Sequence, residues 1–530
     1  MNTGAIVRHS LKLAMLTATS RVIGLVREMV RAAYLGTTAF ADAFTIAFLL
    51  PNLMRRLFAE GSIAVAFVPT FKGYLIENDR EKIRTFLSSF LTVLTFLVTV
   101  AVLAGIVASD GIISVFYADL SPDIRQETAL LTRLMFPYLA FVSIAAFFQG
   151  MLNSVNIFGP SGFVPILFNV CVVAATVLLS PHLENPARAM TVGVLAGGFL
   201  QATVQLPFAL KAGFRFVFRP LRAAFSDPGV RRIFVLIAPT IIGMAAYEVN
   251  LLASSVIANT AGTGVVSALQ FSNRLLELLL GVFAVSIGTV VLTELSDNAK
   301  RGAWDKFSGH LLFSANAVAL VTIPATVFSV LNATDIVTLV FKARAFDDRS
   351  VALTAAIFLF HIAGLYLIAV NRVLAPAFYA QEDTRSPTWA GIASFGANIA
   401  LCLLLVGPFA GPGIALAGTL AALVNTLLLV LPLWRRDRAL FGPAIRRGVA
   451  YLGRIILLSV IAAAPAWALK PFVIPLFSAN PWRIIALGAP LAILAALFFS
   501  LLFAALLFLR DEQALHLLRR LRARIGRTGV

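Results

Sequence analysis

The feature that most constrains this sequence is a series of long apolar stretches without a charged residue. They cover residues 85–109, 189–210, 311–334, 386–434 and 484–509. A helix of about 20 apolar residues crosses the hydrocarbon core of a bilayer, so each stretch can supply one or two spans. Hydrophobic residues make up 59% of the chain and charged residues 13%, whereas a soluble domain is about 45–50% apolar. The sequence therefore predicts an all-α polytopic membrane protein.

The apolar segments and the basic residues between them predict a topology. Fourteen transmembrane helices are expected, at 5–34, 40–71, 85–109, 126–153, 161–180, 187–211, 231–259, 263–295, 309–332, 350–379, 386–407, 411–434, 450–470 and 483–510. Nineteen Lys and Arg residues follow even-numbered helices and seven follow odd-numbered ones. Because basic loops stay in the cytoplasm, both termini are predicted to be cytoplasmic.

Composition and spacing argue against several other functions. The net charge of +18 is attributed to this topology and to attraction for anionic membrane lipids, and no nucleic acid partner is expected. The two cysteines lie in apolar stretches, and the five histidines are scattered without metal-ligand spacing. The chain contains no Gly-Lys dipeptide and therefore no phosphate-binding loop of the ATPase type. We expect no metal, no cofactor and no enzymatic activity.

Weak internal similarity predicts how the helices are grouped. Phe58 and Phe283 begin matching Phe-Ala pairs 225 residues apart, and other matches have offsets of 220 to 229. These offsets predict two pseudo-repeated six-helix lobes, residues 1–220 (helices 1–6) and 221–440 (helices 7–12). Helices 13 and 14, within 441–510, stand outside the repeat. Residues 511–530 are predicted to form a basic amphipathic cytoplasmic tail that lies on the membrane.

Charged residues interrupt three of the predicted helices, and on each helix they fall on one face at about 100° per residue. The three polar stripes contain Arg21, Arg27, Glu28 and Arg31 in helix 1, Asp42, Thr45, Asn52, Arg55, Arg56 and Glu60 in helix 2, and Gln270, Asn273, Arg274 and Glu277 in helix 8. Intramembrane charge is costly and usually faces a bundle interior or a water-filled cavity. The stripes hold six arginines and four acids, which predicts a central cavity with a positive bias.

Two roles are open to these arginines. A guanidinium donates bidentately to phosphate and stays charged when desolvated, so a cationic cavity suits a phosphorylated ligand. Alternatively, an arginine can extend to the membrane interface or lock two helices together. We favour this second role for Arg31 and Arg56, and the cavity role for Arg21, Arg27 and Arg274. Helical spacing predicts the ion pairs Glu28–Arg31, Arg56–Glu60 and Arg274–Glu277.

Four segments resemble motifs of one family, the MurJ (MviN) lipid II flippases of bacteria, which belong to the superfamily of multidrug, oligosaccharidyl-lipid and polysaccharide exporters. They are SRVIGLVRE (20–28), ADAFTIAFLLPNLMRRLFAEGSIAVAFVP (41–69), NRLLE (273–277) and LAPAFYAQEDTRSP (374–387). The resemblance implies two lobes around a central cationic cavity, with helices 13 and 14 forming a groove for the lipid tail. It also implies alternating access in the bacterial inner membrane.

The resemblance further implies a substrate and a set of binding residues. The substrate would be lipid II, which is undecaprenyl diphosphate carrying the disaccharide-pentapeptide of peptidoglycan, bound by a monomer. Matched by motif, the substrate-binding residues are Arg21, Arg27, Glu28, Asp42, Asn52, Arg55, Glu60 and Arg274. The alternatives are a flippase for another polyprenyl-diphosphate-linked glycan, a drug exporter, or a non-transporting scaffold for envelope enzymes.

Overall fold

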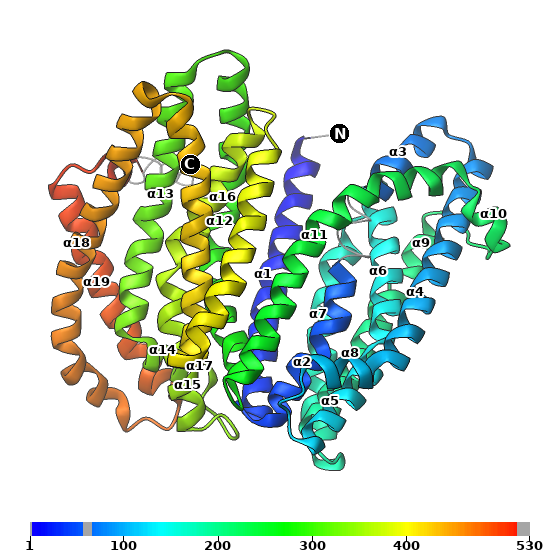
Figure 1. Cartoon of the computed structure of the whole chain (residues 1–530), viewed down its shortest axis with the longest axis horizontal. Coiled ribbons are helices and arrows are strands. Elements are labelled where there is room, and N and C mark those ends of the chain that lie inside the picture. The colour runs from blue at the N-terminus through cyan, green and yellow to red at the C-terminus, as the bar shows by residue number, and fades with distance from the viewer. Residues whose placement is uncertain (1–2, 57–65, 517–530) are drawn as a thin grey trace. The chain divides into compact units, whose positions relative to one another are not determined.

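A computed structural model describes residues 3–56 and 66–516 of the chain, and most of these residues lie in helices (Figure 1). The one β-type pairing among these residues is an isolated bridge between Ala343 and Phe346. By internal contacts the chain divides into two compact units. The first comprises Met1–Ser267 with Ala343–Asp347, and the second comprises Ala268–Lys342 with Asp348–Val530. The predicted all-α class is confirmed, whereas the lobe boundaries at 220 and 440 stay a prediction.

The first unit contains the first six predicted helices, the seventh, and the start of the eighth. Its helices are α1 (Thr3–Leu35), α2 (Ala39–Arg55), α3 (Val68–Glu77), α4 (Arg80–Phe116), α5 (Pro122–Met135), α6 (Pro137–Ser154), α7 (Gly159–Leu179), η3 (Ser180–His182), α8 (Pro186–Thr203), α9 (Leu206–Lys211), α10 (Leu221–Phe225), α11 (Pro228–Thr260) and the beginning of α12 (Val265–Lys300).

Glycines let α8 pack closely against α7. A methyl group added at Gly193 would lie 2.8 Å from the Cα of Val172, and one added at Gly197 would lie 3.3 Å from the Cα of Phe168. Small residues spaced four apart are the usual way in which membrane helices bring their backbones together. This packing buries Phe168 and Val172 in a core that α2 and α5 also enter. It thereby fixes the ring of Phe168, over which the guanidinium of Arg27 on α1 lies.

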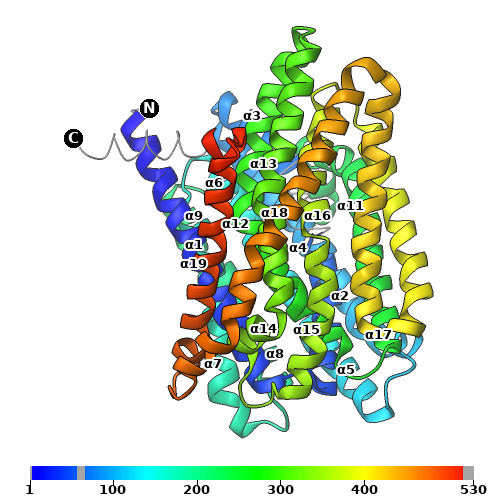
Figure 2. The same cartoon turned by 90° about the vertical axis from the view of Figure 1, so that its left-hand side faces the viewer.

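The second unit contains the rest of α12 and the helices that follow it. They are α13 (Trp304–Leu331), α14 (Ala333–Phe341), α15 (Asp348–Ala363), α16 (Leu365–Tyr379), α17 (Arg385–Arg436), α18 (Arg438–Ser478), the π-helical turn η4 (Ile484–Gly488) and α19 (Ala489–Phe508). In Figures 1 and 2, α18 and α19 lie side by side, and their apolar faces pack with α13 into one core.

The predicted helices lie where helices are observed, but several of them begin, end or are interrupted at other residues than predicted. The predicted helices 386–407 and 411–434 form α17, which is interrupted at Ala410, a residue with φ of 49° between Pro408 and Pro412. The predicted helix 126–153 is divided before Pro137 into α5 and α6. Helix α14 was not predicted, and α18 extends well beyond 450–470 at both ends.

Among the described residues, nine helical segments are long and apolar enough to cross a membrane. One of them, Arg385–Arg436, contains two of the predicted helices. The four remaining predicted spans correspond to α1, α2, α11 and α12, and all four carry charged residues along their lengths. A total of fourteen spans is therefore consistent with the fold and stays a prediction.

The start of the predicted surface tail is packed into the second unit. Ala514 is fully buried in the core formed by α13, α18 and α19. The buried carboxylate of Asp511 accepts hydrogen bonds from the N–H of Ala514 at 3.0 Å and the hydroxyl of Tyr451 at 3.3 Å, and it lies 3.6 Å from the guanidinium of Arg454. Residues 511–516 therefore belong to the bundle, which corrects the predicted start of the tail; residues 517–530 lie outside the described residues.

Candidate functional site

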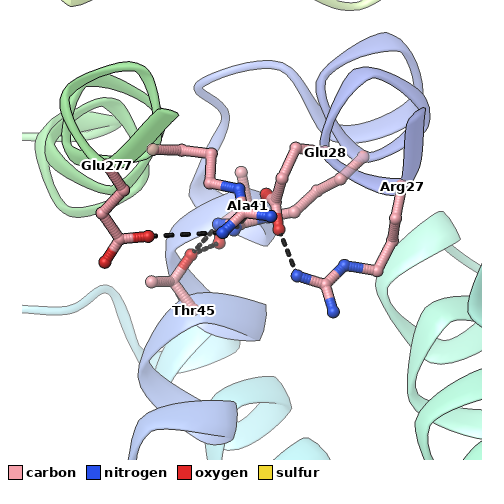
Figure 3. Close-up of polar contacts among 7 residues, drawn as sticks. Arg27, Glu28, Ala41, Thr45 and Glu277 are labelled. Carbon is pink, nitrogen blue, oxygen red and sulfur yellow. Dashed lines mark hydrogen bonds and ion pairs between the residues drawn. The ribbon is translucent and has the colours of Figure 1, made fainter. Parts of the chain in front are cut away.

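Two adjacent arginines of α1 share one buried carboxylate. Nη2 of Arg27 lies 2.5 Å from Oε1 of Glu28, and Nη1 of Arg31 lies 3.3 Å from Oε2 (Figure 3). Arg31 also donates to the hydroxyl of Thr45 on α2 and lies over the ring of Phe44. Because its side chain is only 4% exposed, Arg31 locks α1 to α2. Both its predicted pairing with Glu28 and its predicted structural role are confirmed.

Arg27 is the accessible member of this cluster. Its side chain is 24% exposed, and its guanidinium lies 5.7 Å from the centre of the Phe168 ring on α7. A carboxylate on one side and an aromatic face on another orient the planar guanidinium of Arg27, and part of the guanidinium stays exposed. Arg21 is exposed one and a half turns earlier on α1. Arg27 can therefore bind an anion without first breaking the contacts that hold α1 in place.

Asp42 on α2 caps the start of α12. The N–H of Gly264 and the N–H of Ser267 donate to its carboxylate at 2.5 and 2.8 Å, and the Ser267 hydroxyl donates at 2.7 Å. The side chain is almost completely buried, and a carboxylate at a helix N-terminus satisfies donors that have no partner within the helix. This geometry gives Asp42 a positioning role, while its predicted contact with substrate stays a prediction.

The end of α2 carries two adjacent arginines with different partners. Nε of Arg55 donates to Oδ1 of Asn52 at 2.9 Å, so these two predicted site residues contact each other. Arg56 instead reaches α11, where Nη1 lies 3.4 Å from Oε1 of Glu248. The predicted partner of Arg56, Glu60, lies outside the described residues, and so does its predicted role at the site.

Arg274 belongs to the second unit, on α12. Its Nη1 lies 3.3 Å from Oε2 of Glu277, which confirms the predicted pair, and the two side chains are 27% and 52% exposed. Within the first unit the structure brings together Arg27 with Glu28 and Asn52 with Arg55. The predicted joint contact of Arg21, Arg27 and Arg274 with one diphosphate stays a prediction.

Two polar residues of the site were missed from sequence. Glu248 follows fifteen uncharged residues of α11 and is 4% exposed, and an acid in such a position is a signal that could have found it. Counting it reduces the excess of arginines over acids from two to one. Ser267 carries no comparable signal, because its role depends on the approach of α2 to the start of α12.

The described side chains of the site are suited to binding an anion. Among the residues that the structure describes, no group of three or more His, Cys, Asp and Glu side chains is placed to hold a metal ion. The polar groups are guanidiniums, carboxylates and amides set among apolar helices, an arrangement suited to holding an anionic group within a membrane. The fold and the site together define a polytopic membrane transporter.

Comparisons with known proteins identify the family. The family model "Lipid II flippase MurJ" matches residues 31–480. A protein of Treponema pallidum described as "Probable lipid II flippase MurJ" is 42% identical over 525 residues, which is 98% of each chain. The chain therefore belongs to the MurJ family of lipid II flippases.

Solved structures agree at the level of the fold. A structure titled "Lipid II flippase MurJ, inward closed conformation" has a TM-score of 0.75 at 23% identity, covering 94% of this chain and 99% of that one. An inward-facing multidrug transporter of the MATE family in the MOP superfamily has a TM-score of 0.64 at 10% identity, covering 82% of this chain and 95% of the other. These two likenesses confirm the predicted fold.

Proposed function

We propose that this protein moves lipid II from the cytoplasmic to the periplasmic leaflet of the bacterial inner membrane by alternating access. The observation that carries the proposal is the partly exposed guanidinium of Arg27, oriented by Glu28 and Phe168 within an apolar bundle. Membership of the MurJ family over nearly the whole chain supports the same substrate. The diphosphate of lipid II is the anionic group that an arginine fork binds best.

In this proposal the charged residues have different roles. Arg21, Arg27 and Arg274 bind the diphosphate and the polar headgroup, while Asn52 orients Arg55. Glu28 and Glu277 neutralise their neighbours when no substrate is bound, and Asp42 holds the start of α12. The headgroup occupies a cationic cavity, which opens first to the cytoplasm and then to the periplasm.

The lipid tail is proposed to run along helices 13 and 14, which are α18 and α19. A pocket between α13, α18 and α19 supports this assignment, because its lining is apolar except at Asn332. The lining residues are Phe328, Leu331, Asn332, Ala463, Ala466, Trp467, Leu494 and Phe498. Such a surface accepts a polyprenyl chain without desolvating a charge.

The remaining features of the proposal concern topology and partners. Both termini lie in the cytoplasm, as the basic connections indicate. The protein works as a monomer in contact with anionic lipids, and transport requires no catalytic step by its own side chains. Fusion reporters at Met1 and Val530 that are active only in the periplasm would overturn this topology and the direction of transport.

Complementation tests the proposed function. The gene is expressed in a bacterium depleted of its own lipid II flippase, and growth and lipid II accumulation are measured. Restored growth with normal lipid II levels supports the proposal. Failure by a protein that reaches the membrane at normal levels, combined with rescue of a strain lacking another polyprenyl-linked glycan flippase, would assign a different substrate. Failure in both strains would favour a drug exporter or a scaffold.

A further inference from the structure

Glu248 on α11 and Arg56 at the end of α2 form an ion pair within the first unit. Glu248 lies 16 residues beyond Arg232 in α11, which places it about 24 Å further along the helix axis. Within α11, residues 233–247 and 249–260 carry no charged side chain, so Glu248 interrupts a long uncharged stretch. Its partner Arg56 directly follows α2, 17 residues after the helix begins at Ala39. An ionisable residue within a long uncharged stretch of a membrane protein's helix is by default a candidate for function.

The two members of this pair are unequally accessible. The side chain of Glu248 is 5% exposed and that of Arg56 is 33% exposed. The guanidinium also lies 5.8 Å from the centre of the Tyr247 ring, and Tyr247 itself is exposed. A buried anion is thus covered by a cation that another anion can still reach.

The distance between the two charged groups is also long. Nη1 of Arg56 and Oε1 of Glu248 are 3.4 Å apart, whereas a strong charge-assisted hydrogen bond measures about 2.7–2.9 Å. Elsewhere in the same unit, Arg188 holds Glu127 with two bonds, of 2.9 Å from Nε and 2.7 Å from Nη2. Arg188–Glu127 has the geometry of a structural clamp, whereas the contact between Nη1 of Arg56 and Oε1 of Glu248 is longer than either of these bonds.

We infer that Glu248 is an internal counterion of Arg56. It pairs with the Arg56 guanidinium when no substrate is bound, and a phosphate of the substrate displaces it. The inference rests on the proposed function, since it assumes a diphosphate ligand. The Glu248 carboxylate occupies the position on Arg56 that a phosphate of the substrate would take, and it competes with that phosphate. The competition weakens ground-state binding of the substrate and favours its release after transport. Arg56 thereby becomes a substrate-contacting residue, and Glu248 tunes the affinity without touching the substrate.

Binding to purified protein in detergent tests this inference, with lipid II and undecaprenyl diphosphate as the two probes. Glu248→Gln removes the competing charge while keeping the shape, so it is expected to bind both probes at least about fivefold more tightly, at the low end of site-to-site coupling. In an Arg56→Ala background the same change is expected to alter affinity less than twofold. Persistent tightening in that background would mean that Glu248 acts through the general field of the site, and it would overturn the pairing with Arg56.

Two further variants keep the test decisive. Glu127→Gln removes a buried, arginine-paired carboxylate from the same unit, and its affinity for both probes is expected to match the wild type. If Glu248→Gln fails to fold, Glu248→Asp keeps the charge but withdraws it from Arg56 and is expected to tighten binding by a smaller factor. Unchanged or weaker binding in the folded variant would make Glu248 a structural lock.

The same measurements separate this inference from the proposed function. If wild-type protein binds lipid II but Glu248→Gln binds it no more tightly, the counterion is rejected and the proposed function stands. Suppose that wild-type protein binds undecaprenyl diphosphate but not lipid II, and that Glu248→Gln binds undecaprenyl diphosphate more tightly. The counterion role of Glu248 is then supported, and the transported lipid carries a glycan other than that of lipid II. If wild-type protein binds neither probe, both proposals fail.

Discussion

The carboxylate of Asp42 accepts two hydrogen bonds from Ser267, one from its backbone N–H at 2.8 Å and one from its hydroxyl at 2.7 Å. These residues are 225 positions apart, and their contact joins α2 to the first turn of α12. The N–H of Gly264, a residue with φ of 90°, donates to the same carboxylate. A methyl group at Gly264 would lie 2.3 Å from the Thr37 carbonyl oxygen, so α12 begins where a side chain would not fit.

Asp42→Ala is therefore expected to destabilise the protein. The change leaves two buried N–H groups without their acceptor, which costs about 2–4 kcal/mol in free energy of unfolding, while the Ser267 hydroxyl can still donate to the Gly264 carbonyl oxygen at 3.1 Å. Ser267→Ala removes one donor and should cost about 1 kcal/mol. Thermal midpoints in detergent measure both effects. If Asp42→Ala keeps the wild-type midpoint but loses lipid II binding, Asp42 contacts the substrate directly.

Sequence patterns predicted the helices well because a bilayer leaves a spanning segment few alternatives. They also predicted the local pairs Glu28–Arg31 and Arg274–Glu277, whose spacing alone brings the side chains together. They missed the partner of Arg56, because Glu248 lies 192 residues away on another helix and only tertiary packing brings it near. The start of the tail was misplaced for the same reason, since burial of Ala514 depends on neighbours that no local pattern contains.

Two truncations of the C-terminus should distinguish the contribution of the packed residues 512–516 from that of residues 517–530. Deleting 512–530 removes Ala514 from its core and Gln513 from the carbonyl oxygen of Phe313, to which its amide donates at 3.3 Å. We expect a lower thermal midpoint and reduced complementation from this variant. Deleting 517–530 spares these contacts and should complement as the wild type does. Equal behaviour of the two truncations at equal membrane levels would contradict the packing role.

Asp383 should stabilise the start of α17 in a pH-dependent way. The Ser386 hydroxyl and the N–H groups of Ser386 and Arg385 donate to its carboxylate at 2.6, 2.9 and 3.0 Å. These hydrogen bonds, that of the Ser386 hydroxyl first, hold the pKa of Asp383 below its usual value. A cap of this kind contributes about 1 kcal/mol, so Asp383→Ala should lower the thermal midpoint at pH 7.

The sign of the pH effect follows from the lowered pKa. The charge-dependent contribution is complete above the unfolded-state pKa of about 3.9 and is lost as pH falls through the lower folded-state value. The difference in midpoint between wild type and Asp383→Asn should therefore shrink below about pH 4. A difference that stays constant on acidification would show that the cap works equally well as a neutral acceptor.

Lysine is expected not to replace Arg27 or Arg274 in transport. Each guanidinium has one carboxylate partner, Glu28 or Glu277, and remains about a quarter exposed, so part of its fork is open to a diphosphate. An ammonium is a point charge without the planar fork, and each charged hydrogen bond lost costs about 1.5–3 kcal/mol. Both lysine variants should therefore accumulate lipid II almost as alanine variants do, in cells that depend on them. Arg188→Lys, which weakens the ion pairs of Arg188 with Glu127 and Glu184, should transport normally at equal membrane levels. Normal turnover in both lysine variants would reject bidentate binding of the diphosphate, and normal turnover in both alanine variants would reject these arginines as the binding site.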